Sequence, residues 1–145
     1  MTQSSTKRVK VLFLCLGNSC RSPMAEAIAR HAAADVIEAS SAGLIALGFV
    51  AGSTIRVLQE RGYPAEGLQS KMLTRDAFDG ADLVINMSGR PLPQLANRNT
   101  EVEDWEVDDP YGEDPEVYRG TCQEIERRVK DLAERLRSEN GMKQP

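Results

Sequence analysis

A short segment near the amino terminus carries the side chains best suited to chemistry, and it reads CLGNSCRSP from Cys15 onward. A thiol beside a helix start and an arginine ionises readily, which makes Cys15 a candidate nucleophile, with the nearby Ser22 able to donate a hydrogen bond to it. The guanidinium of Arg21 can bind two oxygens of one phosphoryl group at once. Gly17 and Asn18 both tolerate the left-handed backbone that a tight curl needs. These residue types predict a cradle for a tetrahedral oxyanion, with a thiolate at its base.

The amino-acid composition favours catalysis by cysteine over catalysis by a histidine-rich metal site or a Ser-His-Asp triad. The chain of 145 residues has one histidine, His31, and three cysteines, at positions 15, 20 and 122. A single histidine leaves no room for a histidine-rich metal site and argues against a Ser-His-Asp triad. An odd number of cysteines argues against a secreted disulfide framework, so we expect the reducing cytoplasm. Cysteine, carboxylate or arginine must therefore carry any catalysis, although Cys15 taken alone could also be a small buried hydrophobe.

Charge and hydropathy exclude several classes of partner. The net charge is -4, and the basic residues between positions 127 and 137 alternate with acidic ones. This mixture indicates a solvated helix face, so we expect no nucleic acid. No apolar run approaches the ~20 residues of a membrane span, and residues 1–10 contain no signal-peptide core, so we expect no membrane. A hydrophobic content of 41% suits a single domain, which we place at residues 9–140 between flexible ends at 1–8 and 141–145.

Apolar runs and helical patterns alternate along the chain. Short apolar runs, suited to buried parallel strands, occupy Val9–Leu14, Val36–Ala42, Ala81–Met87 and Val102–Val107. Helical spacing or propensity marks Met24–Ala34, Ser53–Arg61, Thr74–Asp79, Pro91–Arg98 and Pro115–Leu136. The apolar stripe of the last helix runs from Val117 through Cys122, which we therefore expect in the core. Strands alternating with helices predict a doubly wound α/β domain.

The candidate cradle lies where such a fold binds ligands. In open α/β sheets, ligands bind beyond the carboxyl ends of the strands, and Cys15 directly follows the first predicted strand. Ser22-Pro23 is a helix-start signal, with Ser22 as the cap and Pro23 in the first helical position. A helix start adds N–H donors and positive potential. Asp109 follows the fourth predicted strand, so we expect its carboxylate at the same edge of the sheet.

The run VLFLCLGNSCRSPMAEA, from residue 11 to residue 27, resembles the amino-terminal signature of the low-molecular-weight protein tyrosine phosphatases and the related thioredoxin-coupled arsenate reductases. The resemblance continues through SAG (41–43), ADLVINM (81–87) and DPYG (109–112), and covers most of Val9–Leu136. It implies a three-layer α/β/α fold, in which a four-stranded parallel sheet carries a phosphate-binding loop after its first strand. It also implies a phosphomonoester hydrolase, a protein tyrosine phosphatase that needs no metal or other cofactor. The implied substrate is a phosphorylated protein or small aryl phosphate, with inorganic phosphate or other oxyanions as ligands.

The resemblance further implies how the site residues act. Cys15 attacks phosphorus and becomes a phosphocysteine, while Arg21 holds the phosphoryl oxygens. Asp109 protonates the leaving oxygen and then deprotonates the attacking water. Asp108 is the neighbouring alternative, and forming a turn before proline is the simpler role for Asp109. The other phosphate-binding residues, implied in the same way, are Leu16, Gly17, Asn18, Ser19, Cys20 and Ser22.

Five positions take supporting roles by the same resemblance. Asn18 and Ser41 brace the phosphate-binding loop through hydrogen bonds. Leu47 and Tyr111 form walls of the substrate pocket, although simple packing is an alternative for Tyr111. Cys20 either guards the nucleophile through a reversible disulfide or packs in the core. For Asn18 and Ser41, a plain turn or strand-end role is the alternative.

The sequence departs from its relatives in ways that leave the substrate open. The arsenate reductases need two further cysteines, and the matching positions here are Ser88 and Leu95, so we place phosphatase above arsenate reductase. Ser19 stands where many tyrosine phosphatases have an apolar residue and protein-arginine phosphatases have threonine, which keeps a protein-arginine phosphatase as a second alternative. Leu68 replaces a histidine that often braces the loop. A module that binds anions without catalysis is the non-enzymatic alternative.

Overall fold

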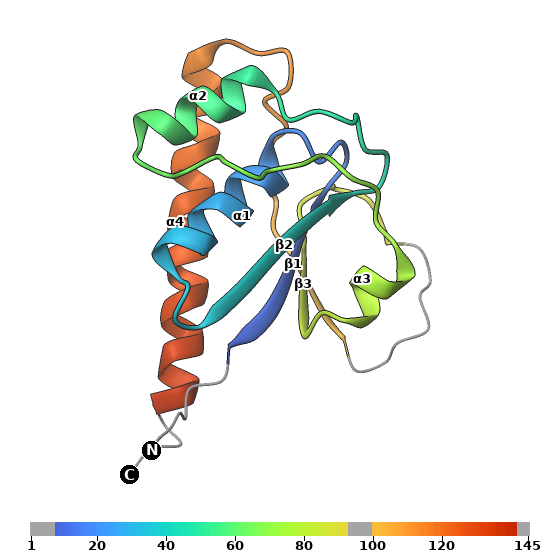
Figure 1. Cartoon of the computed structure of the whole chain (residues 1–145), viewed down its shortest axis with the longest axis vertical. Coiled ribbons are helices and arrows are strands. Elements are labelled where there is room, and N and C mark those ends of the chain that lie inside the picture. The colour runs from blue at the N-terminus through green and yellow to red at the C-terminus, as the bar shows by residue number, and fades with distance from the viewer. Residues whose placement is uncertain (1–7, 93–99, 142–145) are drawn as a thin grey trace.

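Four parallel strands form the sheet at the centre of the computed structural model, which describes residues 8–92 and 100–141 (Figure 1). At the carboxyl edge of the sheet, Cys15 pairs with Gly43 on one side, and Leu14 pairs with Asn86 on the other. The predicted parallel sheet is therefore confirmed. In the order in which they pair, the strands are β2 (Ile37–Gly43), β1 (Val9–Cys15), β3 (Leu83–Asn86) and β4 (Glu101–Asp104).

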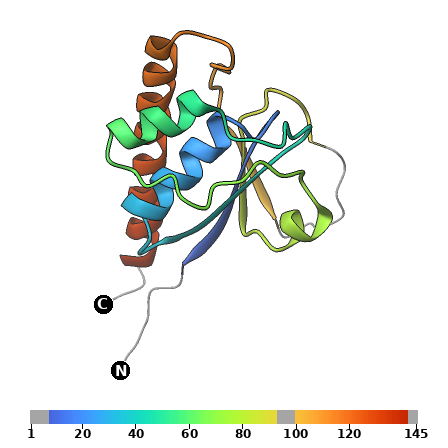
Figure 2. The same cartoon turned by 45° about the horizontal axis from the view of Figure 1, so that its top comes forward.

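Helices cover both faces of this sheet, as Figures 1 and 2 show. In chain order they are α1 (Arg21–Ala32), α2 (Gly52–Glu60), α3 (Arg75–Asp79) and α4 (Pro115–Gly141). One face is covered by α1 and α4, and α2 packs on both of these helices. The short α3 covers the other face. The three-layer α/β/α arrangement that the resemblance implies is confirmed.

The central strand β1 separates two apolar clusters because its side chains alternate between the two faces. Val11 and Phe13 belong to the larger cluster, on the side of α1 and α4, whereas Leu12 and Leu14 belong to the smaller one with Phe78 of α3. These four β1 side chains are at most 1% exposed. Burying each of them contributes about 1.5–3 kcal/mol. This packing on both faces holds the end of β1, and with it the candidate nucleophile, in a fixed position.

The start of α1 differs from the prediction. The helix begins at Arg21 rather than at Pro23, and its N-cap residue, Cys20, makes no side-chain capping hydrogen bond. Ser22 is not the cap, because its hydroxyl is engaged by Cys15 and by another side chain of the preceding loop. The positive potential of an uncapped helix start therefore lies next to the end of β1, which is where an anion is most favourably bound.

The fourth strand is shorter than predicted. It ends at Asp104 rather than at Val107, because its partner β3 ends at Asn86. The backbone N–H of Trp105 still donates to the carbonyl of Asn86 at 3.0 Å, and its ring packs against Phe13, with 6.0 Å between the ring centroids. The predictions for the two chain ends at 1–7 and 142–145, and for most of the helix expected over Pro91–Arg98, lie outside the described residues.

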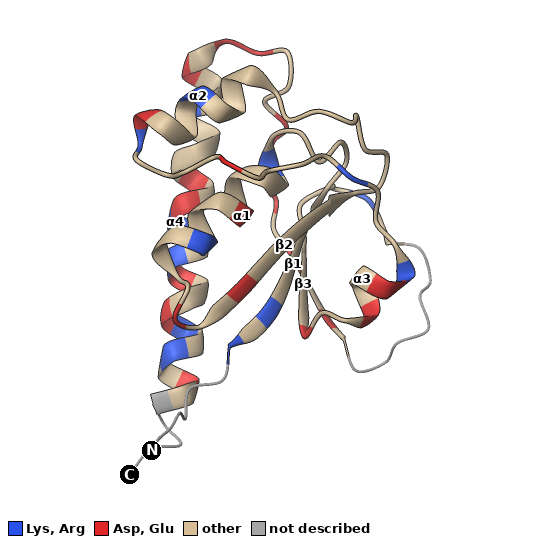
Figure 3. Ribbon diagram, in the orientation of Figure 1, with Lys and Arg blue, Asp and Glu red and all other residues tan. Residues whose placement is uncertain are grey.

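The long helix α4 begins at Pro115 as predicted, and it continues past Leu136 to Gly141. Its predicted apolar stripe is buried except at Val117, which is 41% exposed. Acidic and basic residues alternate along its outer side (Figure 3), and several form ion pairs between successive turns. Within the described ranges, no helix combines the length and the apolar composition that crossing a bilayer requires.

Candidate active site

We call the loop between β1 and α1 the phosphate loop (Cys15–Ser22). Several of its carbonyl groups accept hydrogen bonds from a neighbouring segment of the chain. The carbonyls of Leu16, Gly17 and Ser19 accept hydrogen bonds from the backbone of the segment 45–51, at 2.8, 2.9 and 3.1 Å. Between Gly17 and Cys20, no backbone N–H donates to another residue that the structure describes. This arrangement leaves a set of N–H donors for an oxyanion, as the sequence predicts.

Three residues let this loop curl. Asn18 has a positive φ of 47°, as expected for a residue that tolerates the left-handed region. Contrary to our prediction, Gly17 does not have a positive φ. A side chain at this position would be crowded, because its Cβ would lie 3.1 Å from the side chain of Leu47. A Cβ on Gly43, at the end of β2, would lie 2.9 Å from the backbone nitrogen of Asn18. The curl therefore depends on close approach of neighbouring segments as much as on left-handed geometry.

A chain of hydrogen bonds runs from the candidate nucleophile into the core. The Sγ of Cys15 lies 2.9 Å from the Oγ of Ser22, and the backbone N–H of Ser22 donates to the same sulfur at 3.4 Å. The side-chain amide of Asn18 donates to Ser22 at 2.7 Å and to Ser41 at 3.0 Å. Asn18, Ser22 and Ser41 are at most 1% exposed. The sulfur of Cys15 is therefore held in place by two groups of Ser22, which in turn are fixed from the core.

The guanidinium of Arg21 is anchored at one end and open at the other. Its Nη1 donates to the carbonyl of Met87 and, at 3.1 Å, to that of Val107. Its Nη2 lies 3.5 Å from a carboxylate oxygen of Asp109, and its buried Nε donates to none of the described residues. The edge formed by Nε and Nη2 has the geometry to bind two oxygens of one phosphoryl group.

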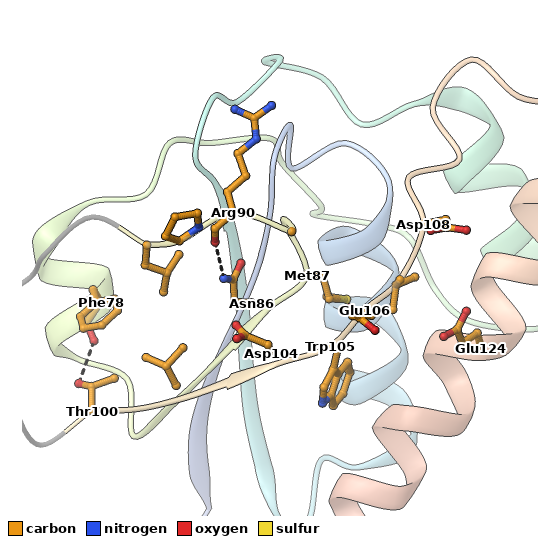
Figure 4. A pocket seen from close by; sticks show the side chains of 15 residues that line it. Phe78, Asn86, Met87, Arg90, Thr100, Asp104, Trp105, Glu106, Asp108 and Glu124 are labelled. Carbon is orange, nitrogen blue, oxygen red and sulfur yellow. Dashed lines mark hydrogen bonds between the residues drawn. The ribbon is translucent and has the colours of Figure 1, made fainter.

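The two neighbouring aspartates face different hollows. Asp109 lines the pocket that contains Cys15 and Arg21, and its side chain is 44% exposed. Asp108 instead lines a larger hollow of about 1220 Å³ along β4, together with Asn86 and Trp105 (Figure 4). The backbone N–H of Tyr111 donates to Asp109 at 3.1 Å and holds its carboxylate in place. The geometry therefore favours Asp109 over Asp108 as a proton donor to a ligand on Cys15.

A small pocket of about 200 Å³ opens above the phosphate loop. Its rim is apolar: Ile45, Leu47 and Tyr111 line it, and all three are between 44% and 61% exposed. Leu47 and Tyr111 thus lie where the sequence predicts pocket walls, and Ile45 is a third wall that we did not predict. The hydroxyl of Ser19, which also lines the pocket, is buried and makes no hydrogen bond to any described residue.

The two other cysteines lie in different surroundings. Cys20 lines the pocket and contacts the hydroxyl of Tyr118 at 3.5 Å. Burial raises the pKa of its thiol, and hydrogen bonding with Tyr118 and Thr54 only partly opposes this. Cys122 is fully buried in α4, where burial raises the pKa of its thiol to about 11. Cys122 packs in the core as expected, whereas a disulfide between Cys20 and Cys15 stays a prediction.

The segment that follows α2 supports the phosphate loop without the histidine that Leu68 replaces. Leu68 packs against the larger apolar cluster instead. The hydroxyl of Ser70 donates to the carbonyl of Gly17 at 3.0 Å, and the backbone N–H of Lys71 donates to the Oδ1 of Asn18 at 2.8 Å. The bracing is therefore present, but it comes from one hydroxyl and one backbone group that carry no recognisable pattern in the sequence.

Sequence reasoning also missed one buried charge. Glu26 of α1 is 2% exposed, and its Oε1 accepts a hydrogen bond from Ser41 at 2.5 Å. A charged residue in a run of small apolar residues is the only signal that could have drawn attention to it. The carbonyls of Met87 and Val107, which anchor Arg21, could not have been found from residue types at all.

With this geometry described, comparison with known proteins identifies the family. Residues 10–142 match the model of the low molecular weight phosphotyrosine protein phosphatase family. The chain belongs to this family. Membership supports phosphatase activity, and it agrees with the resemblance that the sequence shows around Cys15.

The relatives differ in what they act on. Arsenate reductase 1 of Bacillus cereus is 35% identical over 86% of this chain and 93% of its own length. A probable low molecular weight protein-tyrosine-phosphatase of Ralstonia solanacearum, EpsP, is 31% identical over 88% of this chain and 96% of its own. The solved structure of the YwlE arginine phosphatase from Geobacillus stearothermophilus superposes with a TM-score of 0.80 at 28% identity, covering 94% of this chain and 98% of that one. The family is therefore shown, whereas the substrate within it is not.

Proposed function

We propose that this protein is a protein tyrosine phosphatase that hydrolyses phosphomonoesters through a phosphocysteine on Cys15. One observation carries the proposal: a thiol, the open edge of a guanidinium and a carboxylate, from Cys15, Arg21 and Asp109, surround one pocket of about 200 Å³. These three groups supply a nucleophile, an oxyanion binder and a proton donor. Family membership supports the reaction class independently of this geometry.

In the first step the thiolate of Cys15 attacks phosphorus, and the bond from phosphorus to the leaving oxygen breaks. Asp109 gives its proton to that oxygen, so the product leaves as a neutral alcohol or phenol. The Nε and Nη2 of Arg21 and the free N–H groups of the phosphate loop bind the three equatorial oxygens. Because these donors are already oriented, little reorganisation accompanies the transfer.

In the second step Asp109, now a carboxylate, takes a proton from water. The water oxygen attacks phosphorus, the bond from phosphorus to sulfur breaks, and inorganic phosphate leaves. The thiolate of Cys15 is regenerated with Ser22 as its hydrogen-bond donor. Asp109 serves both steps because the first step leaves it deprotonated.

Preference for an aromatic phosphoester is supported by the rim of the pocket. Ile45, Leu47 and Tyr111 present exposed apolar surface around the opening, and a flat ring can pack against such side chains. The pocket volume fits a phosphorylated side chain rather than a large metabolite. A phosphorylated protein is therefore the proposed substrate class.

A protein-arginine phosphatase is the second candidate, and the hydroxyl of Ser19 is the observation that favours it. Ser19 lines the pocket, and its hydroxyl is buried and has no partner among the described residues. A phosphoarginine side chain carries N–H groups that could donate to it, whereas a phosphotyrosine ring could not. The similarity to a solved arginine phosphatase structure points the same way.

An arsenate reductase is disfavoured by the cysteines. Reduction by the thioredoxin route needs two further thiols that can reach Cys15. Cys122 is fully buried in α4, and position 88, two residues beyond the end of β3, is serine. The other position at which a thiol would be expected, Leu95, lies outside the described residues but is not cysteine in the sequence.

A substrate panel on wild-type and Cys15→Ser protein tests the proposal. We expect wild type to hydrolyse an aryl phosphate and a phosphotyrosine peptide, in the presence of EDTA, and Cys15→Ser to be inactive. Acid quenching during turnover should trap phosphate on Cys15, detected by mass spectrometry. Equal phosphate release by both proteins would contradict the assignment of the nucleophile. A higher kcat/KM for phosphoarginine than for phosphotyrosine peptides would favour the second candidate.

A further inference from the structure

One of the carbonyl groups that anchor Arg21 belongs to a tight turn that follows β3. The Nη1 of Arg21 donates to the carbonyl of Met87 in this turn and to that of Val107. Because the same guanidinium presents Nε and Nη2 to the pocket, whatever aims these carbonyls also aims the arginine. Asn86, the last residue of β3, is 5% exposed and is not among the residues that line the pocket. Its side chain is spent on the turn instead.

The amide group of Asn86 has a fixed orientation. Its Oδ1 accepts the backbone N–H of Ser88 at 3.0 Å, and its Nδ2 donates to the carbonyl of Arg90 at 2.9 Å (Figure 4). A backbone N–H can only donate and a carbonyl can only accept, so the oxygen and nitrogen of the amide cannot be exchanged. The hydroxyl of Ser88 also bonds to Oδ1, at 2.7 Å. The side chain of Asn86 therefore holds the turn at two places.

The oxygen of the Asn86 amide binds the same peptide group that contacts Arg21. The carbonyl of Met87 and the N–H of Ser88 belong to one peptide bond, which is planar and trans, so the two groups point in opposite directions. Arg21 binds one side of this peptide, and the Oδ1 of Asn86 binds the other. Fixing the N–H therefore fixes the direction of the carbonyl. A charged donor on the carbonyl also polarises the peptide and strengthens the bond from its N–H.

The neighbouring backbone gives this peptide little support of its own. Regular pairing of β3 ends at Asn86, and the last sheet-like hydrogen bond before the turn runs from the N–H of Met87 to the carbonyl of Leu14, at 2.8 Å. Gly89 follows in the turn with a positive φ of 74°, and glycine leaves the backbone more freedom than any other residue. The peptide thus lies between the end of a strand and a glycine, where a side-chain acceptor has a large influence on its direction.

We propose that Asn86 is a positioning residue for Arg21: its Oδ1 fixes the peptide after Met87 and so aims the carbonyl that anchors the guanidinium. When this peptide is free to rotate, Nη1 keeps only the carbonyl of Val107, and Nε and Nη2 lose their fixed direction toward the pocket. The affinity for a tetrahedral oxyanion then falls, although the surroundings of Cys15 are unchanged. The proposal rests on the proposed function in taking Arg21 as the group that binds the phosphoryl oxygens.

The variants Asn86→Ala and Asn86→Ser form a matched pair that tests this role. Both remove the donor to Arg90 and a similar volume, but only serine keeps an oxygen that can accept the N–H of Ser88. The probe is inorganic phosphate, whose dissociation constant is measured from its protection of Cys15 against iodoacetamide, with the alkylated site located by mass spectrometry. We expect the dissociation constant to rise about tenfold in Asn86→Ala and about threefold in Asn86→Ser. Without phosphate, both should be alkylated within about twofold of the wild-type rate.

Two further variants separate this role from general damage. Thr100→Val removes a hydroxyl that donates to the carbonyls of Phe78 and Ala81 beside the hollow along β4, and it should bind phosphate like wild type (Figure 4). In Arg21→Lys protein, adding Asn86→Ala should raise the dissociation constant by less than about twofold, because both changes act through one guanidinium. If Asn86→Ala does not fold, Asn86→Gln, which moves the amide one methylene too far for this turn, provides the same measurement.

Four results would overturn the proposal: wild-type phosphate affinity in Asn86→Ala, equal losses in Asn86→Ala and Asn86→Ser, alkylation without phosphate that slows as much as affinity falls, or an undiminished loss in Arg21→Lys protein. If Asn86→Ala does not fold, wild-type affinity in Asn86→Gln overturns it as well. If phosphate does not protect Cys15 in wild type, the proposal and the proposed function fail together. Protection needs no turnover, so a protein with the expected pattern but no hydrolysis of any phosphate ester would contradict the proposed function and leave the role of Asn86 intact.

Discussion

The phosphate loop and the segment that carries Asp109 meet at the same pocket, but they are held very differently. Ser19, Ser22 and Arg21 of the loop are all at most 5% exposed, and hydrogen bonds tie the loop to β2, α1 and the segment 45–51. Asp109 has a side chain that is 44% exposed, and it is held by its contact with Arg21 and by the N–H of Tyr111.

In the proposed reaction, this difference matches the different demands on the groups that bind the phosphoryl group and on the acid that protonates the leaving group. The phosphoryl group has the same shape in every substrate, so a rigid cradle stabilises its transition state without reorganisation. The leaving group varies from one substrate to another, so its proton donor belongs on an exposed segment. Substitutions in the loop should therefore affect all substrates alike, whereas substitutions in the Asp109 segment should depend on the leaving group.

The largest effect should come from Arg21→Lys. Lysine cannot present two parallel donors and cannot reach both carbonyls that anchor the arginine, so we expect kcat/KM to fall by roughly 10²–10³. The loss should be equal for activated and poor leaving groups, measured with a series of aryl phosphates. A loss that grows with leaving-group basicity would mean that Arg21 acts through Asp109, and the contrast between the two regions would fail.

Asp109→Asn should follow, with a loss in kcat of about 10² for a phenyl phosphate whose leaving group needs a proton. For an activated nitrophenyl ester the loss should be clearly smaller, because that leaving group departs without protonation. Asp108→Asn is the matched control and should retain wild-type rates, because Asp108 faces the other hollow. The reverse pattern would move the acid to Asp108.

Gly43→Ala, at the end of β2, should displace the neighbouring phosphate loop. Its Cβ would lie 2.9 Å from the nitrogen of Asn18 and from the carbonyl oxygen of Leu16, so the loop must shift. We expect kcat to fall about tenfold for all leaving groups, since a small displacement of donors is costly to catalysis. Gly52→Ala, where a Cβ would meet nothing within 4 Å, is the control. Unchanged kcat in Gly43→Ala would show that the loop is less rigid than the packing indicates.

Tyr111→Ala should have a smaller effect that is confined to binding. Loss of one exposed aromatic wall should raise KM for an aryl phosphate about threefold with little change in kcat. For a substrate without a ring, such as an alkyl phosphate, KM should not change. An equal rise for both substrates would indicate that Tyr111 acts by holding Asp109 and not by contacting the ring.

The smallest effect should come from a region remote from the pocket. Burial alone would raise the pKa of Glu126, but hydrogen bonds from Tyr63 and Arg61 hold it below its usual range. Tyr63→Phe should therefore lower the free energy of unfolding at neutral pH by about 1.5 kcal/mol, without changing kcat.

The pH dependence of that effect follows from the direction of the shift. A carboxyl group with a depressed pKa in the folded state contributes its stability above its unfolded value, about 4.3, and loses it as the pH falls further. The difference between wild type and Tyr63→Phe in urea unfolding should thus shrink below about pH 4. A difference that is constant with pH would show that packing of the ring, and not the hydrogen bond, is responsible.

Much of the fold could be predicted because its signals are local. The apolar run of β1, the proline at the start of α4 and the stripe through Cys122 each depend on neighbouring residues in the chain. The predicted start of α1 was wrong because Ser22 carries a good capping side chain that the tertiary structure uses elsewhere, on Cys15 and Asn18. The predicted end of β4 was wrong because its partner strand β3 ends at Asn86, and the apolar pattern of β4 alone does not reveal the length of its partner.

By itself, the sequence determined the segment of the candidate nucleophile, since Cys15, Asn18 and Arg21 are neighbours in the chain and their spacing is enough to predict a loop suited to an oxyanion. Only the tertiary structure decided what surrounds that segment. The anchoring of Arg21 by carbonyls at Met87 and Val107, and the placement of Glu26 under Ser41, join parts of the chain that are far apart. Such contacts depend on which strands lie side by side, and residue types in a single sequence do not encode that order directly.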